Sequence, residues 1–153
     1  MAIRNSGTSA LQSHLGYWLR FVSNQVSQSF SDKLKAQDVS VAEWVVMREL
    51  YDGERAPSAL AERIAITRGA VTKIADRLIA KSFVTRTASR GDARSQVLAL
   101  TRQGRALVPK LAAIADRNDT EFFGHLSPRE RATIEDAMKD IVRRLGLTQS
   151  PVD

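Results

Sequence analysis

Residues 60–104 read LAERIAITRGAVTKIADRLIAKSFVTRTASRGDARSQVLALTRQG, and the order of patterns in this stretch decides the fold. Apolar residues first recur at helical spacing and give one inner face, formed by Val71, Ile74, Ala75, Leu78 and Ile79. Two segments that look like paired strands, residues 83–88 and 96–101, then flank the turn SRGDARS. The stretch therefore predicts a helix, a short turn, a second helix, a strand, a turn and a strand.

The boundaries of the two predicted helices carry residues that start or stop a helix. Pro57 suits the start of the first helix, and the helical pattern is interrupted at Ala65-Ile66. Thr67 can cap the second helix, residues 67–81, because its side-chain oxygen can accept a bond from a first-turn amide. The two helices and the turn between them match the helix-turn-helix arrangement.

More helices are predicted on both sides of this unit. VSVAEWVVMRELYDG (39–53) can be capped by Ser40, and Glu43 three residues later completes a capping box. SALQSHLGYWLRFVSNQVSQSFSDKLKA (9–36) reads as one long helix that is apolar on more than one side. Such a helix is expected to be buried against both its own core and another chain. The sequence is helical again after the strands, and a last helix opens at Ser127-Pro128.

The composition restricts the classes of protein that fit. A length of 153 residues with 43 % apolar residues suits one domain, or one domain with an accessory helical layer. The absence of cysteine excludes disulfides, thiolate metal sites and cysteine-based peroxide sensing. With only two histidines, His14 and His125, we expect no metal and no cofactor. No apolar run approaches the roughly 18–20 residues of a membrane span, and the N-terminus has no apolar segment like a signal peptide, so a cytoplasmic protein is expected.

The positive charge is concentrated in the middle of the chain. Residues 55–105 hold eleven Lys and Arg against three Asp and Glu, whereas the rest of the chain has a small acidic excess. The net charge of the whole chain is +6. A localised basic surface favours a polyanion as partner over an ordinary solvated surface.

The basic residues fall where a winged helix-turn-helix would contact double-stranded DNA. The second helix of such a unit enters the major groove, and its exposed residues are expected to be Arg68, Thr72, Lys73 and Arg77. Thr67 would offer a phosphate its hydroxyl and the free amides of the helix start. Arg90 and Arg94 would lie along the backbone or enter a narrow minor groove. Asp92 is expected to hold an arginine or the turn, and Arg86 is equally a surface charge or a phosphate ligand.

Residues 60–104 also resemble the signature region of the MarR family of bacterial transcription regulators. The motifs that carry the resemblance are Asp92-Ala93-Arg94 in the wing and Leu100-Thr101-Arg102-Gln103-Gly104 after it. The resemblance implies a mainly α fold with a small β-wing, in which a winged helix-turn-helix (37–101) adjoins a helical dimerisation region (9–36 and 102–147). It also implies a homodimer that binds a pseudo-palindromic operator, commonly as a repressor relieved by a small aromatic or lipophilic molecule.

The sequence departs from the family pattern at two positions. Ala93 stands where many members have an arginine, which removes one possible phosphate contact. Ser82 stands where many members have a glycine that ends the recognition helix in a left-handed conformation. These departures affect which DNA contacts can be transferred from relatives to this chain, and they leave the predicted fold unchanged.

Four residues suggest a site for a small ligand. His14 and Trp18 lie one helical turn apart, as do Trp44 and Arg48, and together they could hold an aromatic carboxylate; the alternative is that both tryptophans belong to the core.

An enzyme is disfavoured because the chain has no cysteine nucleophile, phosphate-binding glycine loop or Gly-x-Ser-x-Gly motif. A winged helix that binds proteins is the stronger rival, but its outer helix face need not be basic.

Overall fold

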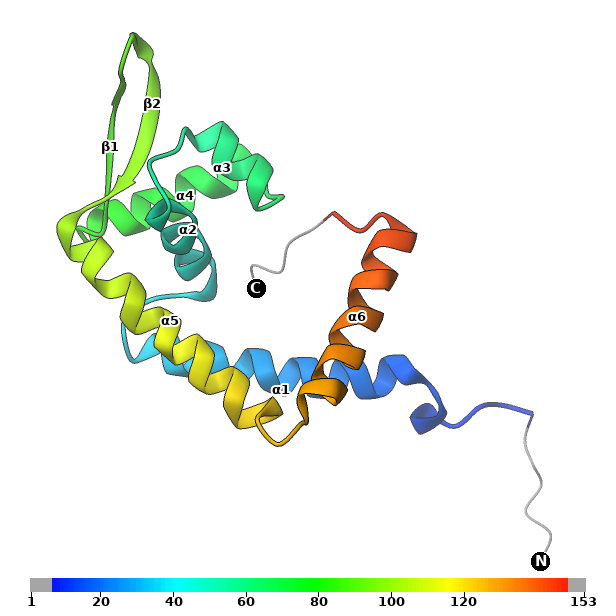
Figure 1. The fold of residues 1–153 in the computed structure, drawn as a ribbon. Helices are drawn as coiled ribbons and strands as arrows, with labels where there is room; N and C mark the ends of the chain where they lie inside the picture. The colour runs from blue at the N-terminus through cyan, green and yellow to red at the C-terminus, as the bar shows by residue number, and fades with distance from the viewer. Residues whose placement is uncertain (1–6, 149–153) are drawn as a thin grey trace, which may run out of the picture.

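The computed structural model describes residues 7–148, and Figure 1 shows their arrangement. A winged helix-turn-helix stands at one end of a long helix pair, and a last helix projects from the other end. In chain order the elements are a 3-10 turn (Leu11–Ser13), α1 (Leu15–Lys35), α2 (Val41–Tyr51), α3 (Pro57–Arg63), α4 (Arg68–Ala80), β1 (Val84–Ser89), β2 (Asp92–Leu100), α5 (Arg102–Phe123) and α6 (Pro128–Leu145). The prediction of a mainly α fold with a small β-wing is confirmed.

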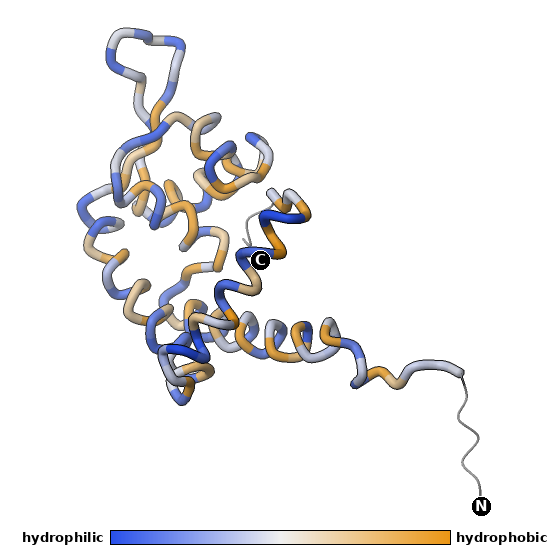
Figure 2. The backbone as a smooth tube through the Cα atoms, turned by 45° about the vertical axis from the view of Figure 1, so that its right-hand side comes forward, coloured by the Kyte–Doolittle hydropathy of each residue, from blue (hydrophilic) through white to orange (hydrophobic). Residues whose placement is uncertain are grey.

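The core of the winged unit forms where α2, α3 and α4 pack together at the base of the β-hairpin. The inner face of α4 is buried as predicted, with Val71, Ala75 and Leu78 fully covered. β1 and β2 pair antiparallel from Val84 opposite Leu100 onward, so the hairpin is anchored at its apolar end. The hairpin extends away from the helices and carries polar residues toward its tip (Figure 2).

The wing differs from its prediction in length. β2 begins at Asp92 rather than at residue 96, and the turn between the strands is reduced to Arg90 and Gly91. Gly91 has a φ of +89°, a conformation that glycine adopts without steric cost. No pattern of residues marks the extra strand residues, because the outer hairpin is exposed and apolar alternation indicates a strand only where one face is buried. Arg94 therefore lies on β2, not in the turn.

The first predicted helix is also interrupted. His14 is extended (φ −91°, ψ 127°), and it separates the 3-10 turn from α1. Two side chains donate hydrogen bonds to backbone carbonyls at this point. The Ser13 hydroxyl donates to the carbonyl of Ala10, and the Trp18 indole donates to the carbonyl of Gln12. Side chains that bond nearby backbone groups compete with the helical ladder, which accounts for the break.

The predicted helix caps are confirmed. Ser40 with Glu43 and Ser127 with Glu130 form reciprocal capping boxes at the starts of α2 and α6. Thr67 accepts a hydrogen bond from the Ala70 amide at the start of α4. These local bonds fix the starts of three helices.

Two helices leave large apolar side chains in solvent. The exposed set lies on the first half of α1 with its preceding turn and along α6 with the residues after it, and it comprises Leu11, Leu15, Trp18, Leu19, Phe21, Val22, Ile134, Met138, Ile141, Val142, Leu145 and Leu147. Figure 2 shows apolar positions recurring along both helices. Within residues 7–148, α6 packs along no other helix. Contiguous exposed apolar surface of this kind marks an interaction site.

The turn between α3 and α4 stores backbone strain at Ala65. Its φ is +53°, and a residue with a Cβ pays for this left-handed conformation. Ala65→Gly should therefore raise the free energy of unfolding by about 0.5–1 kcal/mol. Ala59→Gly is the matched control, because Ala59 is exposed inside α3 and glycine there should lower stability by about 0.5–1 kcal/mol. Urea denaturation followed by circular dichroism measures both; equal losses in the two variants would contradict the prediction.

Candidate nucleic-acid interface

α4 presents a basic outer face because its apolar residues are turned into the core. The residues left outside are exposed, as predicted: Arg68, Gly69, Thr72, Lys73, Asp76 and Arg77. The Thr72 hydroxyl donates to the carbonyl of Arg68, which fixes its rotamer on the helix surface. At the helix start, Thr67 satisfies one first-turn amide, and the remaining ones with the helix dipole form a site that suits phosphate. This face combines a polar hydroxyl, cations and a helix N-terminus.

The orientation of α4 depends on a buried carboxylate of α2. Glu43 is only 2 % exposed, and each of its oxygens meets a cation of α4 or its end. Oε1 accepts from Arg77 Nε at 3.2 Å, and Oε2 accepts from Lys81 Nζ at 2.9 Å while also completing the cap on Ser40. Arg77 keeps 54 % of its side chain exposed, so it lies on the predicted DNA face while its Nε is bound to Glu43.

The wing is held by Asp92 in the way that the sequence suggested. Its Oδ1 accepts from the Arg94 amide at 2.9 Å, and its Oδ2 accepts from the Ser95 hydroxyl at 3.0 Å. Asp92 therefore fixes the backbone after the turn rather than an arginine side chain. Arg90 and Arg94 are both exposed, and within residues 7–148 neither forms an ion pair. Their charges remain available to a partner.

Arg86 differs from these two arginines. Its Nη2 lies 2.8 Å from Asp76 Oδ1, so the charge from β1 is matched by a carboxylate on the outer face of α4. The pair ties the first wing strand to the recognition helix. Of the two roles open to Arg86, this contact supports the surface charge, with an added structural function.

The structure brings a cation of α4 beside a cation of the wing. Arg68 and Arg94 line one hollow of about 260 Å³ together with Ser58 and Gln96, at the point where the start of α3 faces β2. Two unmatched guanidinium groups across a hollow suit a phosphate group, because arginine can bind phosphate oxygens bidentately. Helix and wing therefore meet in one anion-attracting surface.

The motif after the wing has a structural role that the sequence did not reveal. Thr101 caps α5 by accepting from the Gly104 amide, and its hydroxyl donates to the carbonyl of Ser82 at 2.7 Å. A Cβ on Gly104 would collide with the carbonyl of Phe83, so only glycine allows this approach. Ser82 has a φ of +63°, so this serine adopts the left-handed conformation that the family pattern suggested at this position. The motif joins the base of the wing to α5.

The four residues of the predicted ligand site are not gathered in one place within a chain. Trp44 lines a hollow of about 310 Å³ between α1, α2 and α5, which we call the Trp44 pocket. His14 lines a different hollow on the first half of α1, where Trp18 is bonded to the Gln12 carbonyl. Arg48 pairs with Asp52 at 3.0 Å. Joint binding by the four residues stays a prediction.

No helix in residues 7–148 has the length and apolar composition that crossing a membrane requires. Over the same residues, no three His, Asp or Glu side chains gather closely enough to hold a metal ion.

The interface geometry agrees with comparisons to known proteins. Residues 37–95, which span α2 to the wing, match the family model described as MarR family. Over this region the chain is similar to the MarR family. The HTH-type transcriptional regulator SarZ of Staphylococcus aureus is 26 % identical over 137 residues, which cover 89 % of this chain and 91 % of SarZ. The resemblance read from residues 60–104 is therefore confirmed.

Several solved structures share the fold of this chain. BpsR of Bordetella bronchiseptica, whose DNA binding is described as regulated by 6-hydroxynicotinic acid, has a TM-score of 0.76 and 25 % identity, with 88 % of this chain and 97 % of BpsR covered. A mutant MarR from E. coli complexed with operator DNA has a TM-score of 0.75 and 24 % identity, with coverages of 84 % and 93 %. CouR of Rhodococcus jostii, bound to p-coumaroyl-CoA, has a TM-score of 0.75 and 20 % identity, with coverages of 92 % and 96 %.

The buried carboxylate of Glu43 gives a stability prediction. Glu43→Ala should lower the free energy of unfolding by about 1–3 kcal/mol, because it removes a cap acceptor and the bonds to Arg77 and Lys81. Glu43→Gln should cost less, since glutamine can still accept from the Ser40 amide. Urea denaturation compares both with Glu62→Ala, a change at an exposed carboxylate of α3. If Glu43→Ala is no more destabilising than Glu62→Ala, the carboxylate does not hold α2 and α4 together.

Proposed function

We propose that this chain is a transcription regulator that binds double-stranded DNA as a homodimer. The observation that carries the proposal is the convergence of Arg68 and Arg94, from the recognition helix and the wing, within the basic middle of the chain. The relative SarZ is named as a transcriptional regulator, and the E. coli MarR structure contains operator DNA, which supports the same function here. Because its partner is chromosomal DNA, we place the protein in the cytoplasm.

The residues divide into base readers and phosphate binders. Thr72 and Lys73 lie near the middle of the outer face of α4, where a recognition helix contacts base edges in the major groove. Thr67, Arg68 and Arg94 bind phosphates at the junction of helix and wing, and Arg90 reaches the backbone or minor groove from the tip. Affinity comes chiefly from the phosphates, and the choice of sequence comes from α4 together with DNA shape.

Arg77 acts from a fixed position in this scheme. Its Nε is held by Glu43, while about half of its side chain stays exposed toward the DNA side. A guanidinium has further N–H donors beyond Nε, so the same residue can bind Glu43 and a phosphate at once. Glu43 thus orients Arg77 rather than removing it from the interface.

The dimer follows from the apolar surface on α1 and α6. Leu15 is 74 % exposed and Leu145 is 69 % exposed, values that a second copy would reduce by covering both helices. Closed twofold dimers are the commonest assembly of soluble proteins, and they present two recognition helices to successive major grooves. We accordingly assign residues 9–36 and 102–147 to dimerisation and residues 37–101 to DNA binding.

A small effector completes the proposal. The BpsR and CouR structures are described with 6-hydroxynicotinic acid and p-coumaroyl-CoA, and both share this fold. The Trp44 pocket lies between the helices assigned to dimerisation (α1 and α5) and the first helix of the winged unit (α2). A ligand there touches both regions, so its binding can shift the spacing of the two recognition helices. We propose that the protein represses transcription until this ligand binds.

A protein-binding winged helix is the competing function. Such a module has no need for unmatched arginines on both the recognition helix and the wing, and within the described residues Arg68 and Arg94 are both available. The charge pattern therefore favours DNA.

The test of DNA binding is an Arg94→Ala variant. Loss of one phosphate contact should weaken binding several-fold and reduce the slope of log affinity against log salt concentration by about 1. Fluorescence anisotropy on DNA from upstream of the protein's own gene, beside a scrambled duplex, measures both quantities. Arg129→Ala on α6 is the control, since it removes an exposed arginine far from α4. If Arg94→Ala binds DNA with unchanged affinity, the wing does not contribute to DNA binding. If the parent protein binds both duplexes equally, it is not a site-specific regulator.

The test of the dimer is an Ile141→Glu variant. Ile141 lies in the exposed apolar face of α6, so a charge there should dissociate the dimer at micromolar concentration. Light scattering after size-exclusion chromatography gives the mass. Ala132→Glu is the matched control, because this exposed position of α6 lies on the side opposite Ile141 at 100° per residue. Dimeric Ile141→Glu would show that α6 does not form the interface.

A further inference from the structure

The walls of the Trp44 pocket define a ligand chemistry. α1 contributes Val26, Ser27 and Phe30; α2 contributes Val41, Trp44 and Val45; α5 contributes Ala115, Asn118 and Asp119. The volume of about 310 Å³ is within the range of small-molecule sites. Most of the lining is apolar or aromatic, so the pocket suits a flat ring.

The ionisable lining of this pocket is acidic. Asp119 contributes a carboxylate, and the nine lining residues include no lysine, arginine or histidine. An aromatic carboxylate would therefore find no cation among the lining residues, because the cation paired with Asp119, Arg131 of α6, lies outside the lining. Arg48, which the sequence suggested for such an acid, does not line the pocket and is paired with Asp52.

Lys33 bonds a lining residue of the pocket, Asn118, and its donors are all used. Lys33 Nζ donates to Ser29 Oγ at 2.6 Å, to Asn118 Oδ1 at 2.8 Å and to Glu121 Oε2 at 2.6 Å. An ammonium group has three donors, so these bonds use all of them, and Glu121 matches the charge. Asn118, itself 4 % exposed, is fixed by this lysine and by its own bond to the Val26 carbonyl. Lys33 thus holds Asn118 in place in the pocket lining and is not free to bind an anion.

We propose that the effector of the Trp44 pocket is an aromatic cation, such as a protonated aromatic amine, rather than an aromatic acid. Its ring packs against Trp44 and Phe30, and its ammonium group binds the carboxylate of Asp119. The electron-rich faces of aromatic rings also attract a cation, so the ring walls and the carboxylate act in the same direction. The inference rests on the proposed function for the existence of an effector, but the ligand class comes from the pocket.

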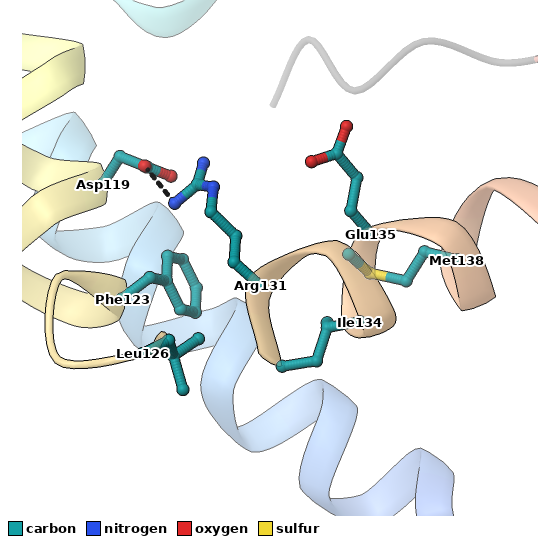
Figure 3. Close-up of a pocket in the computed structure, with 7 residues that line it drawn as sticks. All are labelled: Asp119, Phe123, Leu126, Arg131, Ile134, Glu135 and Met138. Carbon is teal, nitrogen blue, oxygen red and sulfur yellow. Dashed lines mark ion pairs between the residues drawn. The ribbon is translucent and has the colours of Figure 1, made fainter. Parts of the chain in front are cut away.

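The same carboxylate connects the pocket to α6. Asp119 Oδ2 lies 2.8 Å from Arg131 Nη1, and the pair spans the corner between α5 and α6 (Figure 3). The hydrogen bond and the charge of Asp119 raise the pKa of the Arg131 guanidinium. An ammonium ligand competes with Arg131 for Asp119. Binding is thereby coupled to the helix that carries the exposed apolar face.

The experiment uses three ligands with one ring and different charges. Naphthylmethylammonium, naphthylmethanol and naphthoate, all substituted at the same ring position, are titrated into the full-length protein by isothermal calorimetry at neutral pH. The ammonium compound is expected to bind at least about tenfold more tightly than naphthoate, with the alcohol between them. Tighter binding of naphthoate, or no binding of any of the three, would overturn the proposal.

Three variants test the role of Asp119. Asp119→Asn should weaken ammonium binding at least about tenfold while naphthylmethanol binds as before, which also verifies the fold of the variant. Arg131→Gln should act in the opposite direction and tighten ammonium binding, because it removes the competitor. Asp116→Asn, one turn earlier on α5 and outside the pocket, should match the parent. An Asp119→Asn effect no larger than that of Asp116→Asn would exclude the carboxylate as the ligand's partner.

The same preparations separate this inference from the proposed function. DNA binding without any ligand is measured by anisotropy on each protein. Normal DNA binding with no preference for the ammonium compound would refute the ligand class alone. Ammonium binding in a protein that fails to bind DNA would instead refute the regulator.

Discussion

The buried carboxylate of Glu43 is the contact on which the geometry of this protein depends. It caps α2 and accepts from Arg77 and Lys81 of the recognition helix, so one side chain fixes both where α2 starts and how α4 lies against it. A carboxylate that is 2 % exposed is costly to desolvate unless its oxygens are bonded, and here each oxygen is. The same bonds thus stabilise the fold and aim the outer face of α4.

The sequence predicted this unit well where burial leaves a periodic trace. The limits and inner face of α4 followed from apolar spacing and from the cap at Thr67. It failed where no face is buried, as in the outer part of β2, and where side chains compete with the backbone, as at Ser13 and Trp18. The left-handed conformation of Ala65 could not be predicted locally, because tertiary packing imposes a conformation that alanine does not prefer, whereas that of Ser82 was suggested only by the family pattern.

The roles of the arginines show why site residues are harder to predict than elements. Arg77, Arg86 and Arg94 have the same chemistry, although Arg86 is less exposed than the other two. Arg86 is matched by Asp76 and Arg77 is tethered by Glu43, whereas Arg94 lies beside Arg68 without an acidic partner among the described residues. Glu43 is 34 residues away from Arg77 in sequence, so spacing alone could not separate these cases.

Asp119 provides a second link between distant parts of the chain. It lines the Trp44 pocket on one side and binds Arg131 of α6 on the other, while the bonds of Lys33 hold α1 against α5 beside it. An ion pair about half exposed contributes little to stability, so exchanging Arg131 for a ligand cation costs little free energy. A contact with this small cost is suited to switching, because modest binding energy is enough to displace it and to release α6 from α5.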